Sequence, residues 1–213
     1  MSVTFPKGFQ AAGVAAGLKA SGNPDVALVA NDGPEFVSAG VFTSNRIKAA
    51  PVLWTQQCNS NGSFRAVVLN SGGANACTGP DGFADTHHTA ELVADLLQIG
   101  AIDVAVCSTG LIGKRLPMDK LTSGIQQAHQ ALAIDGGNDA ATAIMTTDSV
   151  AKTSSYESPD GWRIGGMAKG AGMLAPGLAT MLVVITTDAS IDATHADTAL
   201  RQATRVSFDR IDS

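Results

Sequence analysis

The sequence predicts an α/β fold of mixed α+β type, in which layered sheets are flanked by helices. Short apolar runs bounded by glycine, proline and asparagine have the length of buried strands, and two longer segments repeat apolar residues at helical spacing. The two kinds of element mix without strict strand–helix–strand alternation, which favours layered sheets. The chain has 213 residues, 45% of them hydrophobic, which suffices for the core of one large or two small domains.

The first third of the chain is expected to hold three strands. Residues 1–25 are rich in glycine and alanine and are predicted to form loops with short extended pieces. The apolar run 25–30 is a predicted strand that ends in a turn at 31–34. Two further apolar runs, 39–43 and 51–55, are also predicted to be strands.

The middle of the chain alternates between strands and helices. Residues 64–70 are predicted to form a strand, followed by a polar loop at 71–77. Residues 83–97 are expected to form a helix, because four apolar residues share one stripe: Phe83, Ala90, Val93 and Leu97. A short buried strand is expected at 103–107.

The clearest helix follows Leu116. Pro117 fits the first turn of this helix, and five apolar residues then recur at intervals of three and four: Met118, Leu121, Ile125, Ala128 and Leu132. A weaker helical signal covers 139–145. The rest of the chain is predicted to form strands at 162–168 and 180–187 and a final helix at 193–206.

Charge and hydropathy disfavour two classes of partner. The net charge is −5, the pI is near 5.2, and there is no run of basic residues, so nucleic acid is not an expected partner. No apolar run approaches the roughly 18 residues that a membrane span needs. Residues 1–13 lack the pattern of a signal peptide. We therefore expect no membrane association and a cytoplasmic location.

The cysteines and histidines give no pattern for a metal. Cys58, Cys77 and Cys107 form no Cys-x-x-Cys pair, so we expect reduced, mostly buried thiols. Cys107 has apolar neighbours, which favours an inert thiol over a nucleophile. His87 and His88 are adjacent, so on a helix they point about 100° apart. An exposed helix surface is their simpler interpretation, and no metal is predicted.

The junction before the strand at 180–187 has the composition of a self-cleaving site. Residues 170–177 are rich in glycine and proline, and the small residue Ala179 precedes Thr180. A threonine hydroxyl in this position can attack the carbonyl of its own preceding peptide bond. Thr180 would then be a new amino terminus, a nucleophile whose free amine acts as base. The alternative is an ordinary strand that begins with a β-branched residue.

A second polar loop, 107–113, follows the strand at 103–107. A glycine amide beside a small hydroxyl residue, here Gly110 beside Thr109, can donate two hydrogen bonds to a developing oxyanion. A plain turn is the alternative. A phosphate loop is disfavoured, because the residue after Lys114 is arginine rather than serine or threonine.

Two further positions could contact a polar substrate. Thr146, Thr147 and Asp148 place two hydroxyls and a carboxylate in a row, which could bind a substrate or cap a helix end. Lys169 ends a predicted strand eleven residues before Thr180. It could be a solvated surface group, or it could hold a carboxylate or tune the nucleophile.

Four segments, taken together and in this order, resemble the ornithine acetyltransferase (glutamate N-acetyltransferase) family of arginine biosynthesis. The resemblance extends from about Pro6 to the end of the chain, and the block around Thr180 is its most specific part. The segments are 70–79, 107–113, 144–148 and 167–182.

The resemblance implies self-cleavage between Ala179 and Thr180. Residues 1–179 would be the α-chain region and residues 180–213 the start of the β-chain region. The two pieces would stay associated, commonly as an α2β2 heterotetramer. The region after Thr180 is short compared with the family, so we expect a truncated fragment or a remainder that lies in another chain.

The resemblance also implies a reaction. Thr180 would take an acetyl group from N-acetyl-L-ornithine, form an acetyl-threonine and pass the group to L-glutamate. Some members also use acetyl-CoA as donor, and no other cofactor is expected. Thr109 and Gly110 match the oxyanion-hole positions, and Thr146, Lys169 and Thr180 match substrate contacts. Two alternatives stay open: an N-terminal-threonine amidohydrolase or aminopeptidase, and an inactive fragment that binds a partner.

Overall fold

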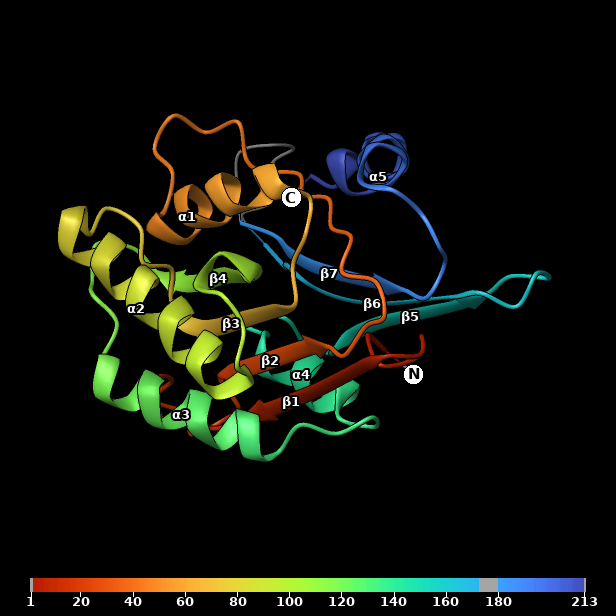
Figure 1. The fold of residues 1–213 in the computed structure, drawn as a ribbon. Helices are drawn as coiled ribbons and strands as arrows, with labels where there is room; N and C mark the ends of the chain where they lie inside the picture. The colour runs from red at the N-terminus through yellow and green to blue at the C-terminus, as the bar shows by residue number, and fades with distance from the viewer. Residues whose placement is uncertain (1, 173–179, 213) are drawn as a thin grey trace.

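The computed structural model describes residues 2–172 and 180–212, and it arranges them in layers (Figure 1). A four-stranded sheet has the order β1-β2-β3-β4. The first two pairs of strands are antiparallel, and β3 and β4 are parallel. Its strands are β1 (Phe9–Val14), β2 (Val26–Asn31), β3 (Ala66–Gly73) and β4 (Val104–Leu111).

The parallel pair is joined by helix α2 (Gly79–Leu97), so β3 and β4 end at the same edge of the sheet. Ser71 pairs with Thr109 in this register, and Gly72 pairs with Gly110. The carboxyl ends of neighbouring parallel strands are where polar loops meet. This edge is therefore the part of the fold that gathers the residues of the predicted site.

Helices α2 and α3 (Met118–Gln130) cover one face of the sheet, and α1 (Ala50–Cys58) lies along its β4 edge (Figure 1). The apolar stripe predicted for α3 faces inward, since Leu121, Ile125 and Ala128 are buried. They pack against a core that includes Val68 and Val106 of the central strands. Burying an apolar side chain of this size stabilises the fold by about 1.5–3 kcal/mol.

The other face of the sheet packs against α4 (Gly137–Ala143) and a second, antiparallel sheet (Figure 1). The second sheet has the order β5-β6-β7. Its strands are β5 (Lys152–Glu157), β6 (Arg163–Lys169) and β7 (Leu182–Thr187). Leu69 of β3, Ile144 and Met167 of β6 share this second core. The predicted α/β fold with layered sheets and flanking helices is thus confirmed.

Small residues let α4 lie directly on β1. A Cβ atom added at Gly136 would lie 1.9 Å from the carbonyl oxygen of Ala11, and one added at Gly13 would lie 2.1 Å from the carbonyl oxygen of Asp139. No side chain fits at these distances. The glycine and alanine content of the first residues therefore reflects close packing of backbones.

Helix α5 (Ala193–Val206) has the predicted bounds. Its first turn is capped by Asp192, whose carboxylate accepts a hydrogen bond of 2.9 Å from the amide of His195. Thr204 is the residue of this helix that is buried. The described part of the chain also contains three short 3-10 helices: Asn59–Asn61, Ala101–Asp103 and Phe208–Arg210. Among the described residues, no helix is long and apolar enough to cross a membrane.

The prediction of a strand at 51–55 is wrong, because these residues belong to α1. Their β-branched and aromatic side chains serve the free edge of β4 instead. Thr55 Oγ1 donates to the carbonyl of Val106 at 2.8 Å and accepts from the amide of Val106 at 2.9 Å. Trp54 Nε1 donates to the carbonyl of Val104 at 3.0 Å. The helix thus replaces the strand that would otherwise pair with this edge.

The other differences concern strands at the surface. The prediction of a strand at 39–43 is wrong, since this segment has no regular structure. The sequence does not predict strand β5, because all six of its residues are exposed and they show no apolar alternation. The predicted loop at 71–77 begins later, at 74, since β3 runs to Gly73. Pro117 lies just before the first residue of α3.

Candidate active site

The ends of β4 and β6 bring three of the predicted site residues together. Lys169 Nζ donates a hydrogen bond of 3.3 Å to Thr109 Oγ1, although the two residues belong to different sheets. Both are buried, with 5% of Lys169 and 3% of Thr109 exposed. Gly110 follows Thr109 directly. A lysine this deeply buried is not a solvated surface group, so that alternative is excluded.

Gly110 occupies a position that no other residue can take. Its φ is +128°, and an added Cβ would lie 2.6 Å from the carbonyl carbon of Gly72 and 2.7 Å from the amide nitrogen of Gly73. The register of β3 and β4 is irregular at the same point. The strand end therefore bends beside β3 with its backbone uncovered, as an oxyanion site built from backbone amides requires.

Buried hydroxyl and amide side chains hold the ends of β3 and β4 in place through hydrogen bonds. Ser108 Oγ donates to Asn70 Oδ1 at 2.6 Å, and Asn70 Nδ2 donates to the carbonyl of Gly73 at 3.0 Å. Ser71 Oγ donates to the carbonyl of Ala143, the last residue of α4. Fully satisfied buried networks of this kind make a region rigid. The sequence drew attention to 70–79 through the family resemblance and gave no role to these side chains.

The surroundings of Lys169 lower the pKa of its ammonium group. Burial lowers the pKa of its ammonium, the carboxylate of Asp148 opposes this effect, and the positive charge of Lys152 lowers the pKa further. The net direction is downward. Lys169 therefore gives up a proton more readily than a lysine in water.

The loop after α4 lies against the end of β6. Thr146 is exposed and donates its amide to Asp148 Oδ2 at 3.2 Å. Thr147 Oγ1 donates to the carbonyl of Ala171 at 2.7 Å, and the amide of Gly170 donates to Asp148 Oδ1 at 2.8 Å. The second predicted substrate position, Thr146, is thus held on the same side as Lys169.

Lys19 belongs to the same charged region and was missed by the sequence reasoning. Its ammonium donates to the carbonyl of Pro24 at 2.7 Å and to that of Ala143 at 3.5 Å. Burial lowers the pKa of Lys19. Its charge interacts with those of Asp25, Lys169 and Asp148. The available signal was a lone lysine followed by a lone aspartate in an otherwise uncharged loop.

The predicted nucleophile, Thr180, is exposed and lies outside the strand to which the sequence assigned it. Strand β7 begins two residues later, at Leu182, which pairs with Lys169. Thr180 thus lies just before β7, at the end of the second sheet where β6 ends with Lys169. Ala179, the predicted residue before the cleaved bond, lies outside the described residues.

The remaining candidates from the sequence have structural roles. His87 and His88 are exposed on α2, as expected, and the ring of His87 packs edge-on against Trp54 with centroids 4.9 Å apart. All three cysteines are free. Burial raises the pKa of Cys107 to about 12, which makes it a poor nucleophile. Cys77 is exposed, so the expectation of mostly buried thiols is wrong for this residue.

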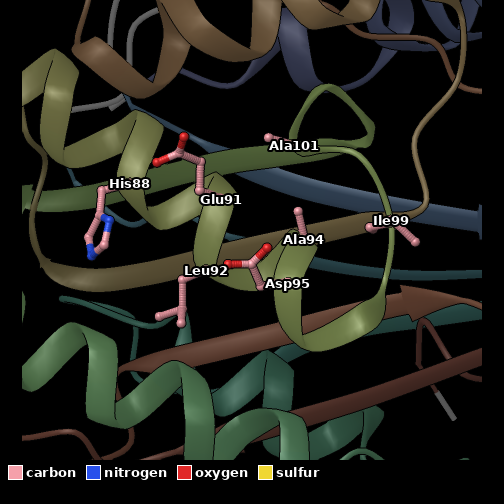
Figure 2. A pocket seen from close by; sticks show the side chains of 7 residues that line it. All are labelled: His88, Glu91, Leu92, Ala94, Asp95, Ile99 and Ala101. Atoms are coloured by element: carbon pink, nitrogen blue, oxygen red, sulfur yellow. The ribbon is translucent and has the colours of Figure 1, made fainter.

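No group of three or more histidine, cysteine, aspartate or glutamate side chains within residues 2–172 and 180–212 could hold a metal. A surface hollow of about 400 Å³ lies along α2, far in sequence from Lys169 and Thr180 (Figure 2). His88, Glu91 and Asp95 are spread along the helix there rather than gathered around one point. This hollow contains none of the predicted site residues.

Fold and site together define a layered α/β protein whose strand ends gather a hydroxyl, a glycine and an ammonium around one edge. The chain belongs to the ArgJ family, whose family model matches residues 10–213. The resemblance inferred from the four sequence segments is therefore confirmed.

Curated relatives match this chain over nearly all of its length. It is 66% identical over 213 residues to the "Arginine biosynthesis bifunctional protein ArgJ" of Streptomyces coelicolor, covering 100% of this chain and 55% of that protein. A protein of the same name from Mycobacterium tuberculosis is 61% identical over 219 residues, covering 99% of this chain and 54% of that protein. The chain thus spans about half the length of the curated relatives it matches.

Two solved structures share the fold. Ornithine acetyltransferase from Mycobacterium tuberculosis, complexed with ornithine, has a TM-score of 0.82 and 61% identity, covering 85% of this chain and 96% of that chain. The "Arginine biosynthesis bifunctional protein argJ" from Bacillus halodurans has a TM-score of 0.76 and 38% identity, covering 85% of this chain and 95% of that chain.

Proposed function

We propose that the protein to which this chain belongs transfers an acetyl group from N-acetyl-L-ornithine to L-glutamate through an ester on Thr180. The observation that carries the proposal is the buried contact between Lys169 and Thr109, beside Gly110. Thr180 precedes β7 at the same end of the second sheet as Lys169. Similarity to a solved ornithine acetyltransferase supports the choice of substrate.

The first step of the proposal is cleavage of the chain. The hydroxyl oxygen of Thr180 attacks the carbonyl carbon of Ala179, and the C–N bond between the two residues breaks as the nitrogen takes a proton. Water then hydrolyses the resulting ester, which leaves a carboxylate on Ala179 and a free amine on Thr180.

The second step is acetyl transfer. The free amine of Thr180 takes the hydroxyl proton while the oxygen attacks the acetyl carbonyl of N-acetylornithine. A tetrahedral oxyanion forms, then collapses as the ornithine nitrogen takes the proton and leaves. The amine of glutamate attacks the acetyl-threonine by the same route in reverse. Because the ester separates the two halves, the kinetics are of the ping-pong type.

Thr109 and Gly110 are proposed to stabilise the oxyanion. An ammonium can only donate hydrogen bonds, so the oxygen of Thr109 accepts from Lys169 and its own hydrogen is directed elsewhere. A hydroxyl that accepts from a cation is also a stronger donor. The bent strand end at Gly110 supplies a backbone amide as second donor. Removing one such donor typically costs about 2.7–4 kcal/mol of transition-state stabilisation.

Thr146 and Lys169 are proposed to contact the substrate. Lys169 offers an ammonium that suits a carboxylate, and Thr146 is exposed beside it.

The proposal includes association of the two cleaved pieces as an α2β2 assembly and a cytoplasmic location. Acetyl-CoA stays a candidate second donor. Size-exclusion chromatography with light scattering measures the assembly.

The decisive experiment uses the complete protein, unmodified and as Thr180→Ala. Intact mass is expected to show two pieces that separate at Ala179–Thr180 for the unmodified protein and one chain for the variant. Incubation with N-acetylornithine alone should add one acetyl group to the piece that begins with Thr180. Normal cleavage of the variant would contradict the proposal. Release of free acetate with no N-acetylglutamate, when glutamate is present, would indicate an amidohydrolase instead.

A further inference from the structure

The carboxylate of Asp148 joins three parts of the site. Its side chain is fully buried and accepts hydrogen bonds from the amide of Gly170 at 2.8 Å and from the amide of Thr146 at 3.2 Å. It also forms an ion pair with Lys152 at the start of β5. Gly170 is the residue after Lys169. One side chain thus connects the end of β6, the loop that carries Thr146, and β5.

A second hydrogen bond fixes the same two segments. Thr147 Oγ1 donates to the carbonyl of Ala171 at 2.7 Å, on the other side of Gly170. Two successive residues of the loop after α4, Thr147 and Asp148, are thus hydrogen-bonded to the two residues that follow β6, Gly170 and Ala171. Such a connection leaves little freedom for Lys169 to move relative to Thr146.

The charges around Asp148 complete the arrangement. Lys169 on β6, Lys152 on β5 and Lys19 in the loop after β1 all act on one another or on this carboxylate. Three ammonium groups around one buried region repel each other, and a single carboxylate among them reduces that repulsion. Asp148 itself stays ionised at neutral pH, because hydrogen bonds from Lys152, Gly170 and Thr146 outweigh the effect of burial and lower its pKa to about 2.

We propose that Asp148 is a positioning residue of this site: its carboxylate fixes Lys169 and Thr146 relative to each other. It touches neither the substrate nor the reacting atoms in this proposal. The reaction that it serves is the proposed acetyl transfer, so that part of the inference rests on the proposed function. The effect of the Asp148 charge on the titration of Lys169 does not depend on that function.

Two substitutions test the inference because they shift the titration of Lys169 in opposite directions. Asp148→Asn keeps the shape of the side chain and removes the charge that favours the ammonium, so the titration midpoint of Lys169 should move to lower pH. Lys152→Gln removes a positive charge that disfavours the ammonium, so the midpoint should move to higher pH. A general loosening of the structure would not produce opposite shifts.

Asp188→Asn is the matched control. Asp188 lies at the other end of the same sheet and accepts hydrogen bonds from the amides of Arg163 at 2.6 Å and Lys7 at 3.0 Å. Its substitution removes the same charge and comparable backbone hydrogen bonds, and it should leave the midpoint of Lys169 where it is.

The measurement is competitive labelling of the complete protein with trace acetic anhydride across a pH series. Peptide mass spectrometry reads the extent of modification of Lys169 at each pH. Rates of acetyl transfer are measured in parallel. We expect transfer by Asp148→Asn to fall roughly tenfold to a hundredfold, since small displacements in an active site cost that much.

The inference is overturned if neither Asp148→Asn nor Lys152→Gln moves the midpoint, or if both move it in the same direction. If Asp148→Asn does not fold, Asp148→Glu replaces it: the carboxylate is kept but displaced by one methylene, so acetyl transfer should fall, and a normal rate would overturn the inference. Opposite shifts in a protein that neither cleaves itself nor transfers acetyl groups would support the role of Asp148 towards Lys169 and refute the proposed function. Normal acetyl transfer with unmoved midpoints of Lys169 would refute the role of Asp148 and support the proposed function.

Discussion

Lys169 at the end of β6 donates a hydrogen bond of 3.3 Å to Thr109 near the end of β4, across sixty residues of sequence and between two sheets. Both side chains are buried. A buried ammonium costs free energy unless it is paired or hydrogen-bonded. One hydrogen bond to a neutral hydroxyl offsets that cost only in part, so the charge of Lys169 does not serve stability. This leads to the first of four predictions.

Lys169→Met should reduce acetyl transfer without destabilising the protein. The variant loses the donor to Thr109 and is expected to lower kcat roughly 10²–10³-fold. The free energy of unfolding should be equal or higher, because methionine has no charge to bury. Steady-state kinetics and urea unfolding measure the two effects. Lys120→Met is the control, since its ammonium donates to the carbonyl of Gly17 at the surface. A large loss of stability in Lys169→Met would contradict the interpretation.

Gly110→Ala should damage both stability and activity, whereas Gly113→Ala should affect stability alone. An alanine Cβ at 110 would lie 2.6 Å from Gly72, and the φ of +128° adds strain. At 113 the φ is +80°, and no atom lies within 4 Å of an added Cβ. Strain alone costs about 1 kcal/mol, while the clash must also displace the strand end. Thermal unfolding and transfer rates separate the two, and equal activities would argue against an oxyanion role for Gly110.

Asp148→Asn should remove a pH dependence of stability in acid. The pKa of Asp148 in the folded protein is about 2, below the ordinary aspartate value of 3.8. A carboxyl group with a lowered pKa stabilises the fold fully above its unfolded value and loses that effect as pH falls through its folded value. The two pKa values correspond to about 2 kcal/mol. Urea unfolding between pH 7 and pH 2 should show the difference between variant and unmodified protein shrinking below pH 4. A constant difference would refute the ion pair's contribution.

Thr55→Val should destabilise the protein by roughly 2–4 kcal/mol, because it leaves a buried amide and a buried carbonyl of Val106 without their partner. Valine has nearly the same shape, so packing is preserved. Thr198→Val on α5 is the control. Its exposed hydroxyl donates to the carbonyl of Thr194 within the same helix, and its loss should cost less than about 0.5 kcal/mol. Equal effects on thermal unfolding would contradict the role of α1 at the edge of β4.

Apolar patterning identified most of the elements. The spacing of Leu121, Ile125 and Ala128 defined α3, and the composition of 64–70 defined most of β3, because burial imposes a period that is visible in the sequence. The polar strand β5 has no such period. Residues 51–55 have the composition of a strand, and α1 forms there because Trp54 and Thr55 satisfy the edge of β4. A partner distant in the chain decided that element.

The sequence by itself determined the family, most helices and strands, and the residue types at Thr109, Gly110, Lys169 and Thr180, since local patterns carry that information. Only the tertiary structure decided that Lys169 meets Thr109, that Gly110 has no room for a side chain, and that Asp148 joins β6 to the loop of Thr146. Each of these is a contact between segments far apart along the chain. Such contacts follow from how two sheets pack around α4, and no local pattern encodes that packing.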